Sequence, residues 1–472
     1  MSFKSCIRQI TPESDLLRAT NIDPEIHNSI FPNVAVPDAA LPSNITSYIY
    51  SPQIIPQLYS YWTGVPGPLP NRAPVKIGIV SLGGGWLQSD LNQGLADVGM
   101  TLSYPITQIL VDGATNSFNA TPGFNGPSTE NTLDLWCVAN MIPTANICII
   151  MGQNTNSGYA NVINRALDEH CDVITSSWST DEYSIGYTDT YLESALARAA
   201  QLGVPFCVST GDYGILGLGE TATVNTCYPA SSPNAVAVGG SVINYNNVNL
   251  AKINETVGEF AGSGISQIFS VPSWQTGLQA NLVTTDTNFN QTSSTVSTIT
   301  GRAIPDVVAP DWHLVLYFNG SVIGSGGTSA SSQLCGAFLA DCISSNHGKR
   351  PIQGNTTVSA IHSMLYQNSG IFNNIASGNN VIQSQYSTNG GITYTPIYSG
   401  YATTTGWNAV TGLGGLSYTG ISRALTTGGT RIKTAAGTWA QVSNVRVKTN
   451  ATTWSNVQNI WTKTINGWSQ TF

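Results

Sequence analysis

Charged side chains are scarce in this chain. Asp, Glu, Lys and Arg make up 9% of its 472 residues, whereas about 25% is usual for soluble proteins. A surface with so few ionisable groups depends little on pH, which suits an acidic or extracellular setting. The net charge of −8 gives no general attraction to phosphate backbones, so no specific nucleic-acid binding is expected.

Long apolar runs are also missing. No segment approaches the roughly 18 apolar residues that a membrane-spanning helix needs, so no membrane span is expected. The eight cysteines are too few for a disulfide scaffold, and none are spaced as a zinc-binding pair, which favours small buried thiols. The N-terminus lacks the apolar core of a signal peptide. Placement in an extracellular or acidic compartment, or on a virion, therefore requires another export route or a chain without its signal.

Histidine is scarce as well. The five histidines do not lie in a motif typical of a protease: His27, His170, His313, His347 and His362. This matters because the stretch GSGGTSASS (324–332) places Ser329 in a glycine-rich loop ahead of an apolar, helix-like run. Such stretches also occur in plain loops, and a serine hydroxyl is a poor nucleophile without an adjacent base. If Ser329 is catalytic, its base is expected to be a carboxylate, and a Ser-His-Asp triad is disfavoured.

From about residue 75 the chain alternates short apolar runs with amphipathic ones. Strands are expected at 75–80, 145–151, 172–177 and 204–210, and helices at 159–170 and 190–201. This alternation predicts an α/β fold with a doubly wound, mainly parallel sheet and helices on both faces. Functional loops are then expected at the carboxyl ends of the strands.

Two carboxylates are spaced to act together. Glu130 and Asp134 lie in STENTLDLWCVANMI with an i, i+4 spacing, which makes their side chains neighbours on one helix face. A carboxylate is a weak base, and a second one helps it to hold a transferred proton. The alternative is an ordinary acidic first turn of a helix, with Ser128 as its cap.

A third acid ends an expected buried strand. Asp212 lies in STGDYG, and when neutral it could donate a hydrogen bond to an oxyanion formed at Ser329. The start of the helix after Ser329 offers backbone N–H groups for the same purpose. The alternative is an ordinary turn aspartate before glycine.

Nine motifs occur in one order along the chain: IGIVSLGGG (77–85), ENTLD (130–134), SSWSTDE (176–182), STGDYG (209–214), YPASSPNAVAVGGS (228–241), VPSWQ (271–275), IPDVVA (304–309), GGTSAS (326–331) and GWNAVTGLG (406–414). Each is weak alone, but the ordered set closely resembles the sedolisins, serine-carboxyl peptidases with a subtilisin-like fold. The resemblance covers about residues 50–425.

The resemblance implies roles for individual residues. Ser329 is implied as the nucleophile, Glu130 as its base, Asp134 as the group that orients Glu130 and shares its proton, and Asp212 as the oxyanion donor. Trp178 is implied at the wall of the substrate site, although a core position is an equal alternative. The implied activity is acid-acting endopeptidase cleavage of peptides or proteins through an acyl-enzyme. One departure is Ser81, which stands where some members have an acid that supports the catalytic groups.

The second departure concerns calcium. Where the family has two aspartate ligands, this chain has Asn374 and Asn408, with the carbonyls of Ile375, Thr404 and Gly406 as further candidate ligands. Both negative charges are lost, and Ca²⁺ affinity depends on ligand charge. We therefore expect calcium to be absent or weakly bound, the loops to be held by amide hydrogen bonds, and no cofactor to be required for the chemistry.

The ends of the chain differ from its centre. We assign residues 1–48 as an N-terminal arm or leader rather than a full propeptide, 49–425 as the peptidase-like domain and 426–430 as a linker. Residues 431–472 contain three short Trp-bearing repeats, in which Lys433, Lys448 and Lys463 recur every 15 residues. Alternating polar and apolar residues predict β-hairpins. Because this segment is basic, with no acidic residue, it is a candidate module for docking to a glycan, a particle or a partner surface, or simply a small β cap.

Two function classes remain open. The leading one is an active acid peptidase. The other is a catalytically idle, peptidase-like structural or virion-associated protein with a C-terminal binding tail. All four candidate catalytic residues are present, and an idle scaffold has no physical need for that combination. Adhesion through the tail alone ranks last, because it leaves the catalytic set without a purpose.

Overall fold

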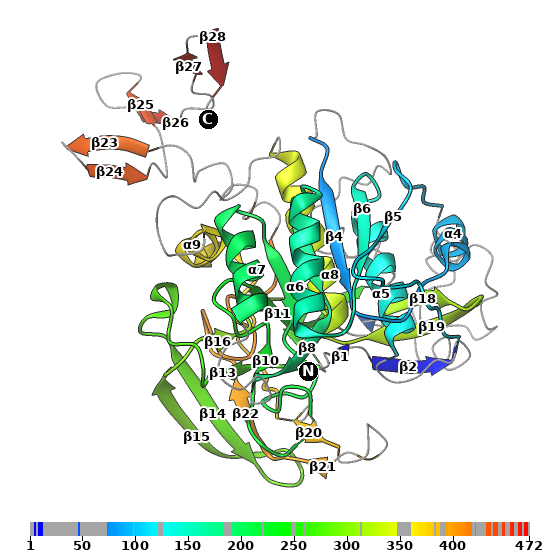
Figure 1. Ribbon diagram of the computed structural model, residues 1–472. Helices are drawn as coiled ribbons and strands as arrows, with labels where there is room; N and C mark the ends of the chain where they lie inside the picture. The colour runs from blue at the N-terminus through cyan, green and yellow to red at the C-terminus, as the bar shows by residue number, and fades with distance from the viewer. Residues whose placement is uncertain are drawn as a thin grey trace.

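A mainly parallel sheet runs through the centre of the molecule (Figure 1). Its strands follow the order β12-β11-β9-β7-β4-β6-β5, and β17 and β3 also pair with β11. The strands are β3 (Thr46–Ser47), β4 (Lys76–Ser81), β5 (Thr107–Leu110), β6 (Asn146–Met151), β7 (Val173–Ser176), β9 (Phe206–Ser209), β11 (Val236–Asn246), β12 (Lys252–Val257) and β17 (Val307–Pro310). All pairings are parallel except those of β11 with β12 and β3.

The structure, a computed structural model, describes only part of the chain. The described residues are 4–5, 8–12, 46–47, 73–97, 99–120, 126–182, 190–219, 221–246, 252–258, 260–311, 314–346, 360–381, 384–387, 393, 395–417, 421, 431–435, 438–441, 446–448, 454–456, 461–464 and 467–470. The arm and linker boundaries assigned at 1–48 and 426–430 fall largely outside these residues and stay predictions.

Helices cover both faces of the central sheet, as predicted. They are α4 (Gln88–Asp97), α5 (Pro127–Met141), α6 (Asn156–Asp168), α7 (Thr190–Gln201), α8 (Thr328–Ser345) and α9 (Ala360–Gln367). One apolar core contains side chains of α4, α5 and α8, and a second contains those of α6 and α7, which lie side by side (Figure 1). None of the helices described is long and apolar enough to cross a membrane.

The four predicted strands all form neighbouring strands of this sheet. Almost every residue of β4, β6, β7 and β9 is buried, because helices cover the sheet on both sides and leave no solvent-facing side. Ile79 belongs to the core under α5 and α8, and its neighbour Val80 to the core under α6 and α7. The seven described cysteines are all buried, as expected of small buried thiols.

Smaller sheets surround this centre. Three-stranded sheets are β1 (Lys4–Ser5) with β8 (Trp178–Asp181) and β10 (Cys227–Tyr228), β2 (Arg8–Pro12) with β18 (Leu314–Phe318) and β19 (Ser321–Gly326), and β14 (Gln279–Thr285) with β15 (Gln291–Thr298) and β22 (Ser399–Ala402). Short pairs are β13 (Gly264–Ile265) with β16 (Ala303–Ile304), and β20 (Gln385–Tyr386) with β21 (Thr395–Pro396). Single 3₁₀ turns are η3 (Ser273–Gln275) and η4 (Ser369–Ile371).

The C-terminal repeats form three antiparallel pairs of strands. These are β23 (Arg431–Ala435) with β24 (Thr438–Gln441), β25 (Arg446–Lys448) with β26 (Trp454–Asn456), and β27 (Trp461–Thr464) with β28 (Gly467–Gln470). In each pair the repeated lysine lies opposite a repeated tryptophan: Lys433 opposite Trp439, Lys448 opposite Trp454, and Lys463 opposite Trp468. The sequence repeat is thus also a repeat of backbone register.

Candidate active site

Ser329 lies in the first turn of α8, directly after β19. Gly327 precedes the helix with φ 104° and ψ 166°, a conformation that side-chain-bearing residues rarely adopt. Its N–H donates to the Asp311 carbonyl at 2.5 Å, which fixes the turn. The helix begins at Thr328, so the backbone N–H of Ser329 belongs to the helix N-terminus, where N–H groups lack intrahelical partners. The serine itself is fully buried.

The structure brings Ser329 and the predicted base together. Ser329 Oγ donates to Glu130 Oε2 at 3.1 Å, although the two residues are 199 positions apart in sequence. Glu130 and Asp134 occupy successive turns of α5, and both are fully buried. This contact has the geometry of a nucleophile and its general base.

Ser128 is not the cap of α5, so that part of the alternative reading is wrong, although Glu130 does lie in the first turn of the helix. The residue at the cap position of α5 is Gly126, and no side chain caps the helix. Ser128 Oγ instead accepts hydrogen bonds from the backbone N–H groups of Gly85 at 3.2 Å and Asn119 at 2.9 Å. Because Pro127 begins the helix, one N–H that a cap would satisfy is already missing.

Asp134 is held by a neighbour that sequence reasoning did not identify. Ser177 Oγ, between β7 and β8, donates to Asp134 Oδ1 at 2.7 Å. Complete burial raises the pKa of Asp134 to about 8, and the polar groups around it, first the hydrogen bond from Ser177 and then the neighbouring Glu130 and Gln333, oppose this rise. Asp134 is therefore neutral across the acidic range, and the carboxyl pair retains a proton to share.

Asp212 lies in the loop that follows the carboxyl end of β9, and its side chain contacts the first residue of α8. Asp212 Oδ1 accepts hydrogen bonds from both the backbone N–H and the Oγ1 of Thr328, each at 2.8 Å. A second connection joins the same loops, because the N–H of Gly211 donates to Thr328 Oγ1 at 3.1 Å. The acid, which is 2% exposed, thus contacts the residue next to Ser329, and its role as an oxyanion donor stays a prediction.

Trp178 lies in the core. Its side chain is 1% exposed and belongs to the apolar cluster of α6 and α7, while Tyr159 Oη donates to its backbone carbonyl at 3.0 Å. This is the position expected of the core alternative, and a role as a substrate-site wall stays a prediction. Ser81 is also buried and donates to the Gly83 carbonyl at 3.2 Å.

The strands on both sides of Ser329 accept additional strands from the N-terminal end of the chain. β1 pairs antiparallel with β8, with Ser5 opposite Trp178. β2 pairs antiparallel with β19, with Arg8 opposite Gly326, three residues before Ser329. Both strands thus pair with extended backbone close to Ser329, which is how a peptide adds to a sheet edge.

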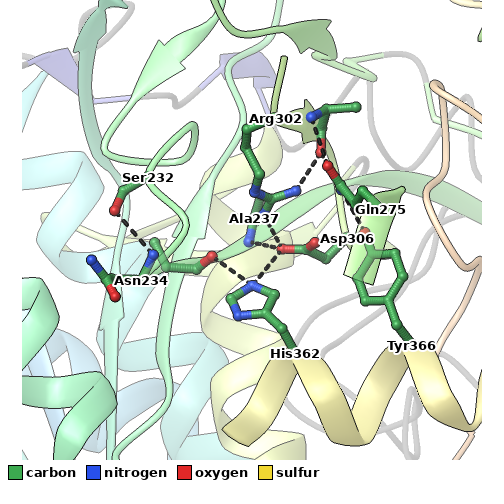
Figure 2. Close-up of polar contacts among 10 residues, drawn as sticks. Ser232, Asn234, Ala237, Gln275, Arg302, Asp306, His362 and Tyr366 are labelled. Carbon is green, nitrogen blue, oxygen red and sulfur yellow. Dashed lines mark hydrogen bonds and ion pairs between the residues drawn. The ribbon is translucent and has the colours of Figure 1, made fainter. Parts of the chain in front are cut away.

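The described histidines, His170 and His362, do not hydrogen-bond Ser329. His362 lies in a buried cluster between α9 and the IPDVVA motif (Figure 2), where its Nε2 is 3.2 Å from Asp306 Oδ2. Burial alone would raise the pKa of Asp306, but the charges of Arg302 and His362 lower it below its ordinary value. Figure 2 shows Tyr366 beside the same carboxyl, to which its Oη donates at 2.8 Å. This arrangement anchors the core and places His362 in a structural cluster rather than beside Ser329.

Asn408 lies at the centre of the loop that corresponds to the family's calcium site. Its Nδ2 donates to three backbone carbonyl oxygens, those of Ile375 at 3.3 Å, Thr404 at 3.3 Å and Gly406 at 3.5 Å. Carbonyl oxygens in such a cradle would otherwise coordinate a cation. In this chain the cradle surrounds an N–H donor.

The orientation of that amide follows from its other end. Asn408 Oδ1 accepts hydrogen bonds from the backbone N–H groups of Val410 at 3.1 Å and Thr411 at 2.9 Å, so the oxygen has to face these donors and the NH₂ group the carbonyls. Asn374, the other expected ligand, is exposed. The described residues contain no cluster of three acids, histidines or cysteines that could hold a metal ion.

Sequence reasoning missed Ser177 and Gln333. Ser177 lies within the motif SSWSTDE (176–182), in which only the neighbouring Trp178 was assigned a role. The available signal for Gln333 was a lone amide at the start of the apolar part of the helix, one turn after the candidate nucleophile. Only tertiary contacts between α8 and the end of β7 reveal its partners.

Comparison with known proteins places these observations in context. The subtilase family model matches residues 117–361, just over half of the chain. Kumamolisin of Bacillus sp. (strain MN-32) is 29% identical over 379 residues, which cover 77% of this chain and 61% of kumamolisin. Sedolisin of Pseudomonas sp. (strain 101) is 29% identical over 296 residues, which cover 58% of this chain and 44% of sedolisin. Against these two curated relatives, the chain therefore spans about half of their length.

A solved structure has a similar fold. The structure of Pseudomonas sedolisin, a serine-carboxyl proteinase complexed with two molecules of pseudo-iodotyrostatin, aligns with a TM-score of 0.61 and 24% sequence identity. The alignment covers 81% of this chain and 99% of that one. At this identity the structural likeness supports the fold rather than a particular substrate.

Proposed function

The chain belongs to the subtilase family, as a sedolisin-like member, and on that premise we propose that it is an acid-acting serine-carboxyl endopeptidase. The observation that carries the proposal is the 3.1 Å hydrogen bond from Ser329 Oγ to Glu130 Oε2. It joins a serine at a helix N-terminus to a buried carboxylate that has a second carboxyl beside it. This arrangement supplies a nucleophile, a base and a place for the proton.

In the first step, Ser329 Oγ attacks the carbonyl carbon of a peptide bond and its proton moves to Glu130. Asp134 shares the proton of the carboxyl pair. Glu130 can therefore accept the proton of Ser329 and become neutral in a site that is shielded from water. When the C–N bond breaks, Glu130 returns the proton to the leaving amine, and an acyl-enzyme remains. Water then attacks the acyl group with Glu130 as the base, and Ser329 is regenerated.

Charge on the carbonyl oxygen is stabilised from two directions. The backbone N–H of Ser329 lies at the N-terminus of α8, where the helix dipole favours a negative charge. Asp212 adds a carboxyl donor. Because Thr328 already donates twice to Asp212 Oδ1, the proton of a neutral Asp212 belongs on its other oxygen. Donation requires that proton, so activity is limited to acidic pH.

Substrates are peptides or proteins that bind as extended strands. The pairings of β1 with β8 and of β2 with β19 support this mode, since they occupy the edges on either side of Ser329. The basic C-terminal hairpins are proposed to direct the enzyme to a glycan, a particle or a partner surface. The scarcity of charged side chains suits an enzyme that acts in an extracellular or acidic compartment.

Calcium is not part of this proposal. The amide of Asn408 donates into the carbonyl cradle that a cation would need, and a cation beside an N–H donor would be repelled. We infer that hydrogen bonds from Asn408 hold these loops together without an ion, and no step of the reaction uses one.

The test is cleavage of a mixed peptide library from about pH 3 to 8, the range over which a carboxylate base and a carboxyl donor change protonation. Cleavage at acidic pH that disappears in Ser329→Ala supports the proposal. A well-folded protein without cleavage at any pH contradicts it and favours the alternative, an idle peptidase-like structural protein with a binding tail.

A further inference from the structure

Gln333 is a buried amide one turn after Ser329 on α8. It is fully buried in a helix whose inner residues are mostly apolar. A buried amide is costly unless its polar atoms are paired. Gln333 Nε2 donates to Ser177 Oγ at 3.0 Å, and Gln333 Oε1 accepts from Thr175 Oγ1.

These contacts determine which group donates and which group accepts in each hydrogen bond. An NH₂ group only donates, so Ser177 Oγ has to accept from Gln333 and place its own hydrogen elsewhere. Two acceptors are in reach, Asp134 Oδ1 at 2.7 Å and the Ser329 carbonyl at 3.4 Å, and the shorter contact is the stronger. Gln333 therefore orients the Ser177 hydroxyl toward Asp134.

The same assignment indicates which oxygen of Asp134 carries a proton. With Asp134 Oδ1 occupied as an acceptor, a proton on Asp134 belongs on Oδ2. That oxygen is buried and has no hydrogen-bond partner among the described residues. Glu130 lies one turn away on α5, and its contact lowers the pKa of Asp134, so a proton on Oδ2 is the one that the pair can share. Glu130 is left as the acceptor for the proton of Ser329.

We propose that Gln333 is a positioning residue for catalysis, which acts through Ser177 to keep the shared proton on the Asp134 side of the carboxyl pair. The chain of contacts begins and ends on α8, because Gln333 and Ser329 are one helical turn apart. Any shift of α8 would move the nucleophile and the group that orients its base together. The role in catalysis rests on the proposed function, whereas the role in orienting Asp134 does not.

The titratable groups around Asp134 are few among the residues described. They are Glu130 on the same helix and Cys137 one turn further along. Burial, and then the charges of Asp134 and Glu130, raise the pKa of the Cys137 thiol well above its ordinary value, so the thiol stays neutral while the carboxyl pair titrates. A change in the titration of Asp134 then reports on its hydrogen bonds.

The experiment uses Gln333→Met in the full chain, since methionine has a similar length and no hydrogen-bonding amide. Two quantities are measured: kcat and KM for a peptide substrate across pH, and the titration of the Asp134 carboxyl by NMR of protein labelled with ¹³C at aspartate. Asp134→Asn assigns the resonance. We expect kcat to fall about tenfold with KM unchanged, the effect of losing one oriented hydrogen bond. Because the lost hydrogen bonds lower the pKa of Asp134, its titration should move to higher pH.

Gln275→Met is the matched control. Gln275 is also fully buried and donates to the Ala303 carbonyl and to Tyr366 Oη, both at 2.8 Å, but it is part of the Asp306 cluster. It should cost stability without moving the Asp134 titration. In Ser177→Ala, adding Gln333→Met should have little further effect on that titration, because the intermediary is gone.

The outcomes separate the two proposals. An unchanged Asp134 titration in a folded Gln333→Met protein overturns the positioning role, as does an equal shift in Gln275→Met. If the wild-type chain cleaves nothing but the titration still moves, the orientation of Asp134 by Gln333 stands and the peptidase function fails. If the wild type is active and Gln333→Met keeps its kcat at every pH, the catalytic part of the inference is wrong.

Discussion

Ser329 Oγ donates to Glu130 at 3.1 Å, while Asp134, one turn further along the same helix, receives its hydrogen bond from Ser177. The two carboxyls are thus held from opposite ends. Glu130 faces Ser329, and Asp134 faces Ser177, which in turn contacts Gln333 in the core. This division explains how two neighbouring acids in a dry site can have different roles.

Glu130→Gln should remove most of the activity. Glutamine preserves the shape and can accept the Ser329 hydrogen bond, but it cannot take the proton. Loss of a general base lowers the rate by about 10²–10⁴-fold, and we expect kcat/KM to fall within that range with the fold intact. Steady-state cleavage at the pH optimum measures the loss, and Glu182→Gln, which changes a buried glutamate bonded by Thr226 and Ser266, serves as control. Near-normal activity of Glu130→Gln would exclude it as the base.

Asp134 should make the protein less stable as pH rises. Its pKa is raised to about 8 from 3.8, so the folded state holds a proton that the unfolded state releases between these values. The free energy of unfolding therefore falls with rising pH across that window, by up to about 1.4 kcal/mol per pH unit. Asp134→Asn removes this dependence. Urea unfolding of both proteins at several pH values should give stabilities that diverge between pH 4 and 8, and parallel curves would contradict the assignment.

The alternation of apolar runs was enough to predict the centre of the fold. The strand expected at 75–80 is β4 at Lys76–Ser81, and the helix expected at 190–201 is α7 with the same bounds. Burial of parallel strands on both faces leaves a continuous apolar run, which sequence reveals directly. The contact of Glu130 with Ser329 was inferred only from the absence of a suitable histidine and the order of the motifs.

The rest depended on tertiary contacts that carry no local pattern. Ser128 resembles a helix cap, yet Pro127 and Gly126 begin α5 and Ser128 bonds another loop. The pairings of β1 with β8 and of β2 with β19 join segments more than 150 residues apart. Short polar stretches of that kind have no periodicity from which a partner could be predicted.

Asn408→Asp should convert a metal-independent loop into a calcium-dependent one. The new carboxylate would face the carbonyl oxygens of Ile375, Thr404 and Gly406 without a donor, at a cost of about 1–3 kcal/mol. Calcium supplies the missing positive charge and should restore the melting temperature at millimolar concentration, a range typical of weak sites.

The controls for that substitution are direct. Wild-type protein should have the same melting temperature in calcium and in chelator. Asn374→Asp, at an exposed position, should be nearly neutral alone and should strengthen calcium binding when combined with Asn408→Asp. A wild-type protein that loses stability in chelator would contradict the view that Asn408 replaces the ion.

Removing residues 1–12 should lower KM for extended peptides. β1 and β2 occupy the edges of β8 and β19 beside Ser329, where the proposed substrate strand would pair, so we expect the chain's own segment to compete with substrate. The expected result is a KM several-fold lower with kcat unchanged, since the deletion touches none of the catalytic side chains. A synthetic peptide of residues 1–14 should inhibit the shortened protein competitively, and a scrambled peptide of the same composition should not. An unchanged KM would mean that these two strands lie outside the path of the substrate.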